Sequence, residues 1–146
     1  MTRDENIHYC VTHNFIDTLN EWNEGTDLEL EILVIEAVKK VRLKEMTVNY
    51  LIKTKSFVFN DLSYSLSQTT ISDVIGLIVL EQDSNIGVRN SEGEDFLVMH
   101  SLQDLKVLLN SIRLYLTNVK TIRYNKVLQL KALTTIDQIE VFDITV

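Results

Sequence analysis

"NSEGEDFLVMHSLQDLKVLL", residues 90–109, decides the fold because it joins a strand to a helix within a short stretch. The acids around Gly93 are typical of a hairpin turn, and the apolar run that ends at His100 predicts a strand. Ser101 and Asp104 then have the spacing of a capping box, which predicts the start of a helix. A strand that leads directly into a helix favours an α+β fold.

The chain that follows this stretch predicts two helices. Apolar residues at helical spacing continue the first one to about Ala132 and make it the strongest helix in the chain: Leu102, Leu105, Leu108, Leu109, Ile112, Leu116, Val119 and Ile122. Thr134 and Asp137 then repeat the capping spacing. We expect a short terminal helix to begin there.

Upstream, "SFVFNDLSYSL" at residues 56–66 predicts another hairpin. Its apolar residues alternate on both sides of Asn60 and Asp61, a pair of residues that suits a tight turn. The aromatic residues Phe57, Phe59 and Tyr64 resemble a stacking platform for nucleic acid, but alternating aromatics in an acidic chain favour a hydrophobic core. We expect the two hairpins to share one small antiparallel sheet that packs against long helices.

Between the hairpins, Ser67 or Thr69 can cap a further helix. Gly76 lies within it at a cost of about 1 kcal/mol relative to alanine. The helix is nearly all apolar, so we expect it to be central. Its apolar residues are Ile71, Val74, Ile75, Ile78 and Val79.

The N-terminal third contains two more predicted helices. The brief alternation of Ile7, Tyr9 and Val11 predicts a short strand or an extended arm. Apolar spacing from Thr12 predicts a short helix that ends near Gly25.

Thr26 or Asp27 can cap a long helix that reaches about Ile52, with acids in its first turns and lysines later, as the helix dipole favours. We therefore predict a helical N-terminal arm at residues 1–35, which is a candidate attachment segment. Residues 36–146 are predicted to form a single α+β domain.

Composition and charge exclude several classes of function. The net charge of the 146 residues is −7; nine acids and one base fall in residues 1–36, whereas six bases and one acid fall in residues 37–60. Phosphate binding needs an uncompensated positive face, so we predict no nucleic-acid partner. The longest apolar run, "ILVI" at residues 32–35, is far shorter than a membrane span, and the N-terminus lacks the pattern of a signal peptide.

A hydrolytic site at residues 92–100 is the first catalytic hypothesis to weigh. Glu92, Glu94 and Asp95 flank a turn glycine, and His100 ends the strand. Acids at a turn are solvated, whereas acid–base catalysis needs carboxylates whose pKa values are shifted by their surroundings. We therefore interpret this stretch as a structural joint.

A zinc site at "HYCVTH", residues 8–13, is the second hypothesis. His8, Cys10 and His13 are all zinc ligands in principle, but a structural site needs four ligands, and His100 is the only other histidine. A three-ligand site would require His100 or an acid to come near. The chain has no phosphate loop and no nucleophile elbow. We predict no metal, no cofactor and no enzymatic activity.

A family resemblance extends this interpretation over residues 36–146. It rests on "EAVKKVRLKEMTVNYLI" (36–52), "KSFVFNDLSYSLSQTTISDVIGLIVL" (55–80), "NSEGEDFLVMHSLQDLKVLLNSIRLYL" (90–116) and "KVLQLKALTTIDQIEVFDI" (126–144). This order resembles a domain-of-unknown-function family of tailed bacteriophages, whose proteins are tied to tail fibres and their assembly. Ser67 and Gln68 match the family's helix entry, Ser101 stands at its cap, and residues 134–139 match its closing helix. The second hairpin of that family commonly carries tryptophan, whereas the only tryptophan here is Trp22.

The resemblance implies a viral structural or assembly role and carries over no catalytic residue. The expected function is that of a virion protein of the tail or tail-fibre region, which binds other tail or fibre proteins and copies of itself. We expect it in the virion tail, and in the host cytoplasm during assembly. The alternative is an assembly chaperone that holds a fibre subunit and then departs. An enzyme would need His8, Cys10 and His13 to assemble with His100.

Partner contacts are predicted on the N-terminal arm and on the long helix after it. Exposed aromatic residues often anchor interfaces, and acidic and basic segments of neighbouring copies can pair and set their register. The acidic segment is residues 27–36 and the basic segment is residues 39–44. The residues predicted to bind partners are Trp22, Glu29, Glu31, Lys39, Lys40, Arg42 and Tyr50.

Overall fold

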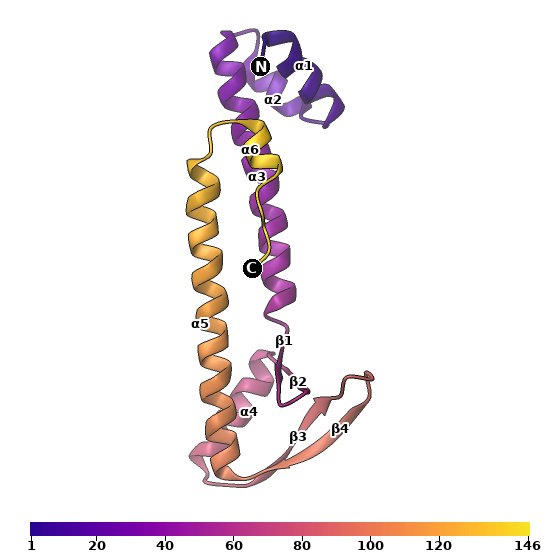
Figure 1. Ribbon diagram of the computed structural model, residues 1–146, viewed down its shortest axis with the longest axis vertical. Coiled ribbons are helices and arrows are strands. Elements are labelled where there is room, and N and C mark those ends of the chain that lie inside the picture. Colours follow the sequence, from indigo (N-terminus) through magenta and orange to yellow (C-terminus); the bar gives the residue numbers. More distant parts are fainter. The chain divides into compact units, whose positions relative to one another are not determined.

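A computed structural model describes all residues, 1–146, and confirms the α+β fold with six helices and one antiparallel sheet of four strands (Figure 1). The chain forms two compact units. The first consists of Met1–Val48 and Tyr124–Thr145, and the second of Asn49–Arg123 with Val146. Two long helices, α3 (Asp27–Lys53) and α5 (Leu102–Ala132), contribute residues to both units. Residues 35 and 36, where the sequence suggested a domain boundary, lie within α3.

The first unit begins with α1 (Arg3–Thr12), where the sequence predicted a strand or an extended arm, so that prediction is wrong. The physical reason is a capping box: the Thr2 hydroxyl accepts from the Glu5 amide, and the Glu5 carboxylate accepts from the Thr2 amide at 2.6 Å. Asn6 and Cys10, four positions apart, are buried on one face of this helix. Local capping chemistry therefore overrides the brief alternation of Ile7, Tyr9 and Val11.

The next helix, α2 (Ile16–Trp22), is shorter at both ends than predicted. Asn14 has a positive φ of 60°, which separates α2 from α1, and Asn23 in the left-handed conformation ends α2 before Gly25. The start of α3 follows the prediction, because the Thr26 hydroxyl accepts from the Glu29 amide and the Glu29 carboxylate accepts from the Thr26 amide. These hydrogen bonds hold the pKa of Glu29 below its usual value.

The terminal helix α6 (Ile136–Glu140) also belongs to the first unit, and its cap is Thr135 rather than the predicted Thr134. The Tyr9 hydroxyl donates to the Glu140 carboxylate and so joins α1 to α6. The buried apolar residues of this unit come from α1, α3, α5 and α6: Cys10, Leu30, Val34, Val38, Met46, Leu130, Ile136 and Ile139.

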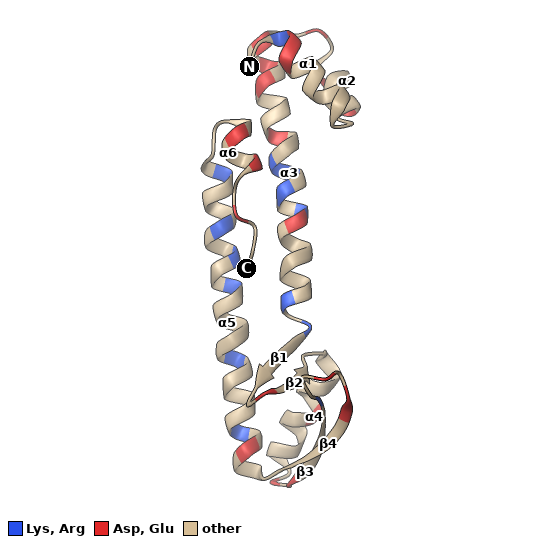
Figure 2. Ribbon diagram, turned by 45° about the vertical axis from the view of Figure 1, so that its right-hand side comes forward, with Lys and Arg blue, Asp and Glu red and all other residues tan.

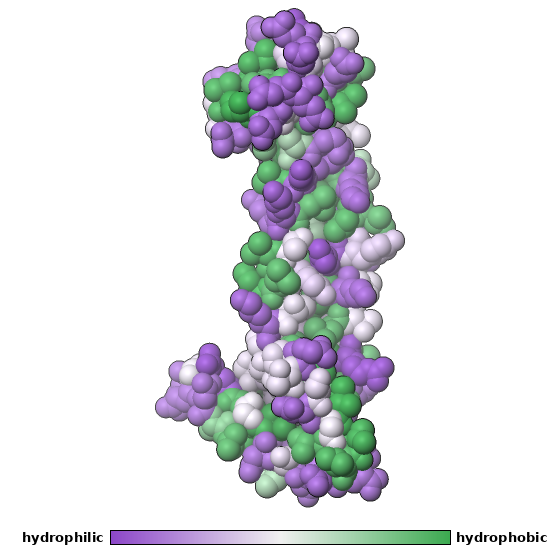
Figure 3. All heavy atoms as spheres, turned by 180° about the vertical axis from the view of Figure 1, so that it is seen from behind, coloured by the Kyte–Doolittle hydropathy of each residue, from purple (hydrophilic) through white to green (hydrophobic).

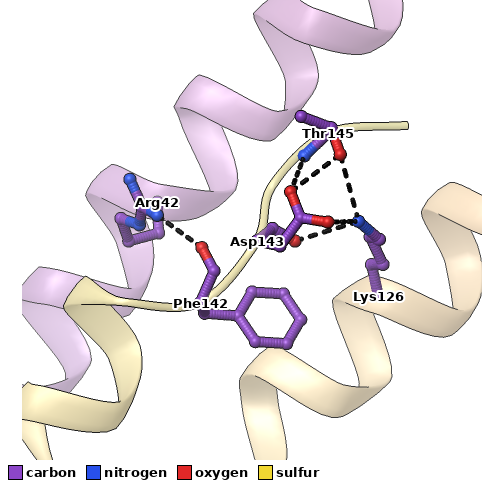
Figure 4. A network of polar contacts seen from close by, with 5 residues as sticks. All are labelled: Arg42, Lys126, Phe142, Asp143 and Thr145. Atoms are coloured by element: carbon purple, nitrogen blue, oxygen red, sulfur yellow. Dashed lines mark hydrogen bonds and ion pairs between the residues drawn. The ribbon is translucent and has the colours of Figure 1, made fainter.

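The segment after α6 is bound by both long helices of the first unit (Figure 4). The Arg42 guanidinium donates to the Phe142 carbonyl at 2.6 Å, and the Lys126 ammonium donates to the Asp143 carboxylate at 2.6 Å. The same carboxylate accepts from the amide and hydroxyl of Thr145. The Lys126 ammonium and the Thr145 donors hold the pKa of Asp143 far below its usual value.

The second unit contains β1 (Ser56–Phe59), β2 (Leu62–Ser65), α4 (Gln68–Val79), β3 (Ser84–Arg89) and β4 (Asp95–His100). The strand order β1-β2-β3-β4 confirms that both hairpins share one antiparallel sheet. Asn60 and Asp61 make the tight turn of the first hairpin, with φ of 50° and 61°. Within each hairpin the pairing is continuous, but β2 and β3 share only the pair Ser63 and Arg89.

The inner face of the sheet packs on α5 and part of α4. Its buried cluster combines strand and helix residues: Tyr64, Leu66, Val74, Ile86, Val88, Leu105, Leu108 and Ile112. In α4, the expectation of a fully central helix is wrong, because Val74 is the helix's only buried residue and Ile75 and Val79 are exposed. A helix with one covered side needs apolar residues on that side only, and Leu77 and Ile78 pack at the border of the buried cluster.

Asp143→Asn tests the segment shown in Figure 4. Because the native pKa is lowered, the charged carboxylate stabilises the fold above the unfolded pKa of about 3.9, and this contribution is lost as pH falls through the native pKa. Urea unfolding at a series of pH values is expected to show Asp143→Asn less stable than the parent chain at pH 6, with the difference shrinking towards pH 2. The control is Asp73→Asn, at an exposed acid of α4. A difference that is independent of pH would contradict the ion pair.

Candidate functional site

Residues 92–95 form hydrogen bonds that stabilise the turn and the end of the second hairpin. The Asn90 side-chain oxygen accepts from the amides of Glu92 and Glu94, and Gly93 adopts a positive φ of 86°. The Asp95 carboxylate receives two hydrogen bonds from the Arg89 guanidinium, at 2.7 and 3.1 Å, which hold the pKa of Asp95 below its usual value. β4 and α5 lie where the sequence predicted them, so the predicted strand and helix start of residues 90–109 are confirmed, and the absence of a hydrolytic site stays a prediction.

His100 belongs to the core of the second unit and is 6% exposed. Its Nδ1 lies 2.8 Å from the Val98 carbonyl, and its Nε2 lies 2.9 Å from the Tyr64 hydroxyl. A carbonyl only accepts, so Nδ1 carries a proton, and in the neutral ring Nε2 accepts from Tyr64. Burial raises the pKa of the Tyr64 phenol. Because β2 and β3 share one residue pair, this hydrogen bond from β2 to β4 is a second link between the hairpins.

The candidate zinc ligands His8, Cys10 and His13 lie on or next to α1. The Cys10 thiol is fully buried, and burial raises its pKa, which lowers the thiolate fraction that metal binding and nucleophilic attack require. His13 stacks on Tyr9 with ring centroids 3.9 Å apart, whereas His8 is exposed. No group of three or more histidines, cysteines or acids is placed to hold a metal. The absence of metal and cofactor stays a prediction.

Three of the residues predicted to bind partners contact other groups of the same chain near the start of α3. Trp22 donates its indole N–H to the Thr26 carbonyl at 2.8 Å and lies under the Arg3 guanidinium. Glu29 caps α3, and Glu31 lies 3.7 Å from the N-terminal ammonium. These contacts give each side chain an internal role, and their predicted role in partner binding stays a prediction.

The remaining four residues divide between buried and accessible positions. Lys39 is buried, donates to the Lys131 carbonyl at 2.9 Å and so supplies a cation at the C-terminus of α5. Arg42 binds Glu45 and Phe142, and Tyr50 lies under the Arg123 guanidinium. Lys40 is exposed. Figure 2 shows the acids at the start of α3 and the basic residues farther along it.

The basic part of α3 also borders a hollow of about 960 Å³ in the first unit. Lysines and acids both line it: Lys39, Lys40, Lys44 and Lys131 with Asp17, Glu21 and Glu36. Charges of both signs give this hollow no preference for anions. Its mixed lining suits a polar surface with both charges better than a phosphate group.

The candidate functional site lies on the uncovered face of the sheet in the second unit, which we call the outer face. Strand alternation assigns its residues, because Ile86, Val88 and Tyr64 point into the core and their strand neighbours point away from it. The register then places the outward residues of adjacent strands together: Ser56, Val58, Ser63, Ser65, Asn85, Gly87, Arg89, Asp95, Leu97 and Met99.

A hollow of about 620 Å³ opens on this face. Its lining includes the serines of β1 and β2 and Gly87 of β3. A Cβ placed on Gly87 would meet nothing within 4 Å, so the missing side chain leaves open space opposite Leu97. No histidine lines the hollow, and its one carboxylate, Asp95, is engaged by Arg89. The lining therefore offers hydroxyl groups, a bound ion pair and apolar side chains to a partner.

Three large apolar side chains of the outer face are more than half exposed: Leu97, which lines the hollow, at 69%, Val58 at 67% and Met99 at 62%. Figure 3 shows hydrophobic atoms at the surface of the part that holds the sheet. Exposed apolar groups gathered on one face mark interaction surfaces, whereas isolated ones are ordinary. Sequence reasoning missed these residues, although the unbroken run "FLVM" in β4 indicated that both faces of this strand are apolar.

Tyr64→Phe tests the buried hydrogen bond. The change leaves His100 Nε2 buried without a donor, which we expect to lower the free energy of unfolding by about 1–3 kcal/mol. Tyr124→Phe is the control, because Tyr124 is 63% exposed and its loss of a hydroxyl is expected to change stability by less than about 0.5 kcal/mol. Chemical unfolding measures both variants. Equal stability of Tyr64→Phe and Tyr124→Phe would contradict the structural role of this bond.

Comparison with known proteins adds no relative, since the chain matches no protein-family model, no curated protein and no solved structure. None of its helices is both long enough and apolar enough to cross a membrane.

Proposed function

We propose that the chain is a protein-binding component of the tail or tail-fibre region of a bacteriophage particle. The proposal rests on the sequence resemblance over residues 36–146 and on one structural observation, the uncovered outer face with its apolar residues around a hollow. Binding to other tail or fibre proteins, without chemistry, is the activity that such a surface supports best.

In the proposed mechanism, a partner covers the outer face and places a side chain in the hollow beside Gly87. Each Å² of apolar surface removed from water contributes about 25 cal/mol, so Val58, Leu97 and Met99 supply the main driving force. The serines supply hydroxyl groups that can donate or accept hydrogen bonds at the hollow. Lys55 and the Arg89–Asp95 pair lie at its edges and favour a partner whose rim is also polar.

The charged segments of α3 provide a second element of specificity in this proposal. Lys40 and Lys44 are exposed in the basic segment, and the start of α3 carries exposed acids. Opposite charges on a neighbouring protein would steer its approach and fix its register, with less effect on the final affinity.

The tail role predicts that the chain remains with purified particles. In protein mass spectrometry calibrated against a known tail protein, we expect a fixed copy number per particle. A Cβ at Gly87 meets no atom within 4 Å, so Gly87→Leu is expected to fill the hollow and leave the fold intact. We expect its incorporation into particles to fall about tenfold, which corresponds to a loss of about 1.4 kcal/mol of binding free energy. Gly76→Leu is the matched control, because a Cβ at Gly76 of α4 also meets open space.

Two outcomes would contradict parts of this proposal. If the unmodified chain is absent from particles but present in infected cells, the virion role is wrong and the assembly chaperone takes its place. If Gly87→Leu and Gly76→Leu are incorporated equally, the partner does not use the hollow of the outer face.

A further inference from the structure

The hydrogen-bond pattern of the second hairpin shows which backbone groups of β4 lie at the free edge of the sheet. The Asn90 amide donates to the Glu94 carbonyl, which makes Asn90 and Glu94 a hydrogen-bonded pair. Hydrogen-bonded and non-hydrogen-bonded pairs alternate along an antiparallel ladder. Phe96 and Val98 therefore bond to β3, whereas the backbone groups of Asp95, Leu97 and Met99 point away from it.

The sheet order leaves these groups without a strand partner, because β4 is at the end of the sheet. Leu97 and Met99 thus present unpaired backbone N–H and C=O groups together with exposed apolar side chains on the outer face. Natural proteins protect such edges with lysines, prolines, bulges or short strands. β4 has none of these devices: its pairing with β3 is continuous over six residues, and the chain contains no proline.

The opposite edge of the sheet differs in these respects. β1 has four residues and follows Lys55 directly. A short strand beside a lysine is a common way to discourage edge pairing. The contrast between the two edges singles out β4 as the one available for strand addition.

We propose that β4 pairs with β4 of a second copy, antiparallel about a twofold axis at Leu97, so that two sheets become one. This register pairs Leu97 with Leu97 of the partner subunit, and Asp95 with the partner's Met99. All three outward residues of each strand then exchange backbone hydrogen bonds. Registers shifted by one step leave an outward residue unpaired, so the arrangement centred on Leu97 satisfies the most backbone groups.

Charge supports a second copy in this orientation. Asp95 is the only charged residue among the three outward positions, and Arg89 of the same chain already engages it. Antiparallel pairing places each Asp95 opposite a methionine, whereas parallel pairing in register would place the two acids side by side. The net charge of −7 on each copy therefore meets no direct acid–acid contact along the paired strands.

Two lysine substitutions test both the interface and its register. Leu97→Lys places two ammonium groups opposite each other, at a Cα separation of about 5.5 Å, and is expected to weaken the dimer about tenfold or more. Met99→Lys places a lysine opposite the partner's Asp95, so this variant is expected to dimerise at least as tightly as the parent chain. Both side chains are largely exposed, so neither change disturbs the core.

Sedimentation equilibrium across a wide concentration series measures the dimerisation of the parent chain and of both variants, and circular dichroism melting confirms that each is folded. A monomeric parent chain at every concentration would overturn the proposal. So would a dimer that Leu97→Lys leaves intact, or one that both lysines weaken equally, because the register would then be wrong. The measurement uses the purified chain alone, so its result is independent of whether the chain occurs in particles.

Discussion

The register of β3 against β4 is the constraint on which the rest of the second unit depends. Pairing Ile86 with Val98 and Val88 with Phe96 directs Ile86, Val88 and Val98 towards the cluster that includes α5. The same register directs Leu97 and Met99 outward and leaves their backbone groups without a strand partner. A slip of one residue would exchange the two faces of β4, so the buried core and the candidate interface are fixed together.

The buried polar pair beneath the sheet compensates for sparse backbone pairing. Each hairpin is closed by its own turn, but their junction has the single residue pair Ser63 and Arg89. The Tyr64 hydroxyl reaches across to His100, and the shared apolar cluster lies around them. His100, which sequence inspection raises as a catalytic candidate, is therefore best explained as a specific, fully satisfied contact of the core.

Sequence reasoning succeeded where local chemistry determines structure and failed where tertiary contacts decide. The turn at Asn60 and Asp61 and the box at Ser101 and Asp104 are local signals, and the elements that they predict are present. The partners of Lys39 and Arg42 are the Lys131 and Phe142 carbonyls, about a hundred positions away, and no spacing rule indicates them. At the candidate site, the apolar run "FLVM" can be identified in the sequence. Which of its side chains are exposed depends on the face of the sheet that α5 covers, and the sequence does not indicate that face. The helix α1 is an exception, because it was missed although Thr2 and Glu5 have the local spacing of a capping box.

Residue-specific amide exchange, measured by NMR on dilute, monomeric protein, tests the register of β3 against β4 together with the free edge of β4. If the register is correct, the amides of Phe96 and Val98 are bonded to β3 and exchange slowly, whereas those of Leu97 and Met99 face solvent and exchange fast. The account predicts this alternation along β4, and raising the concentration is expected to slow Leu97 and Met99 selectively. Uniformly slow exchange from Phe96 to Met99 in the dilute sample would contradict a free edge at β4.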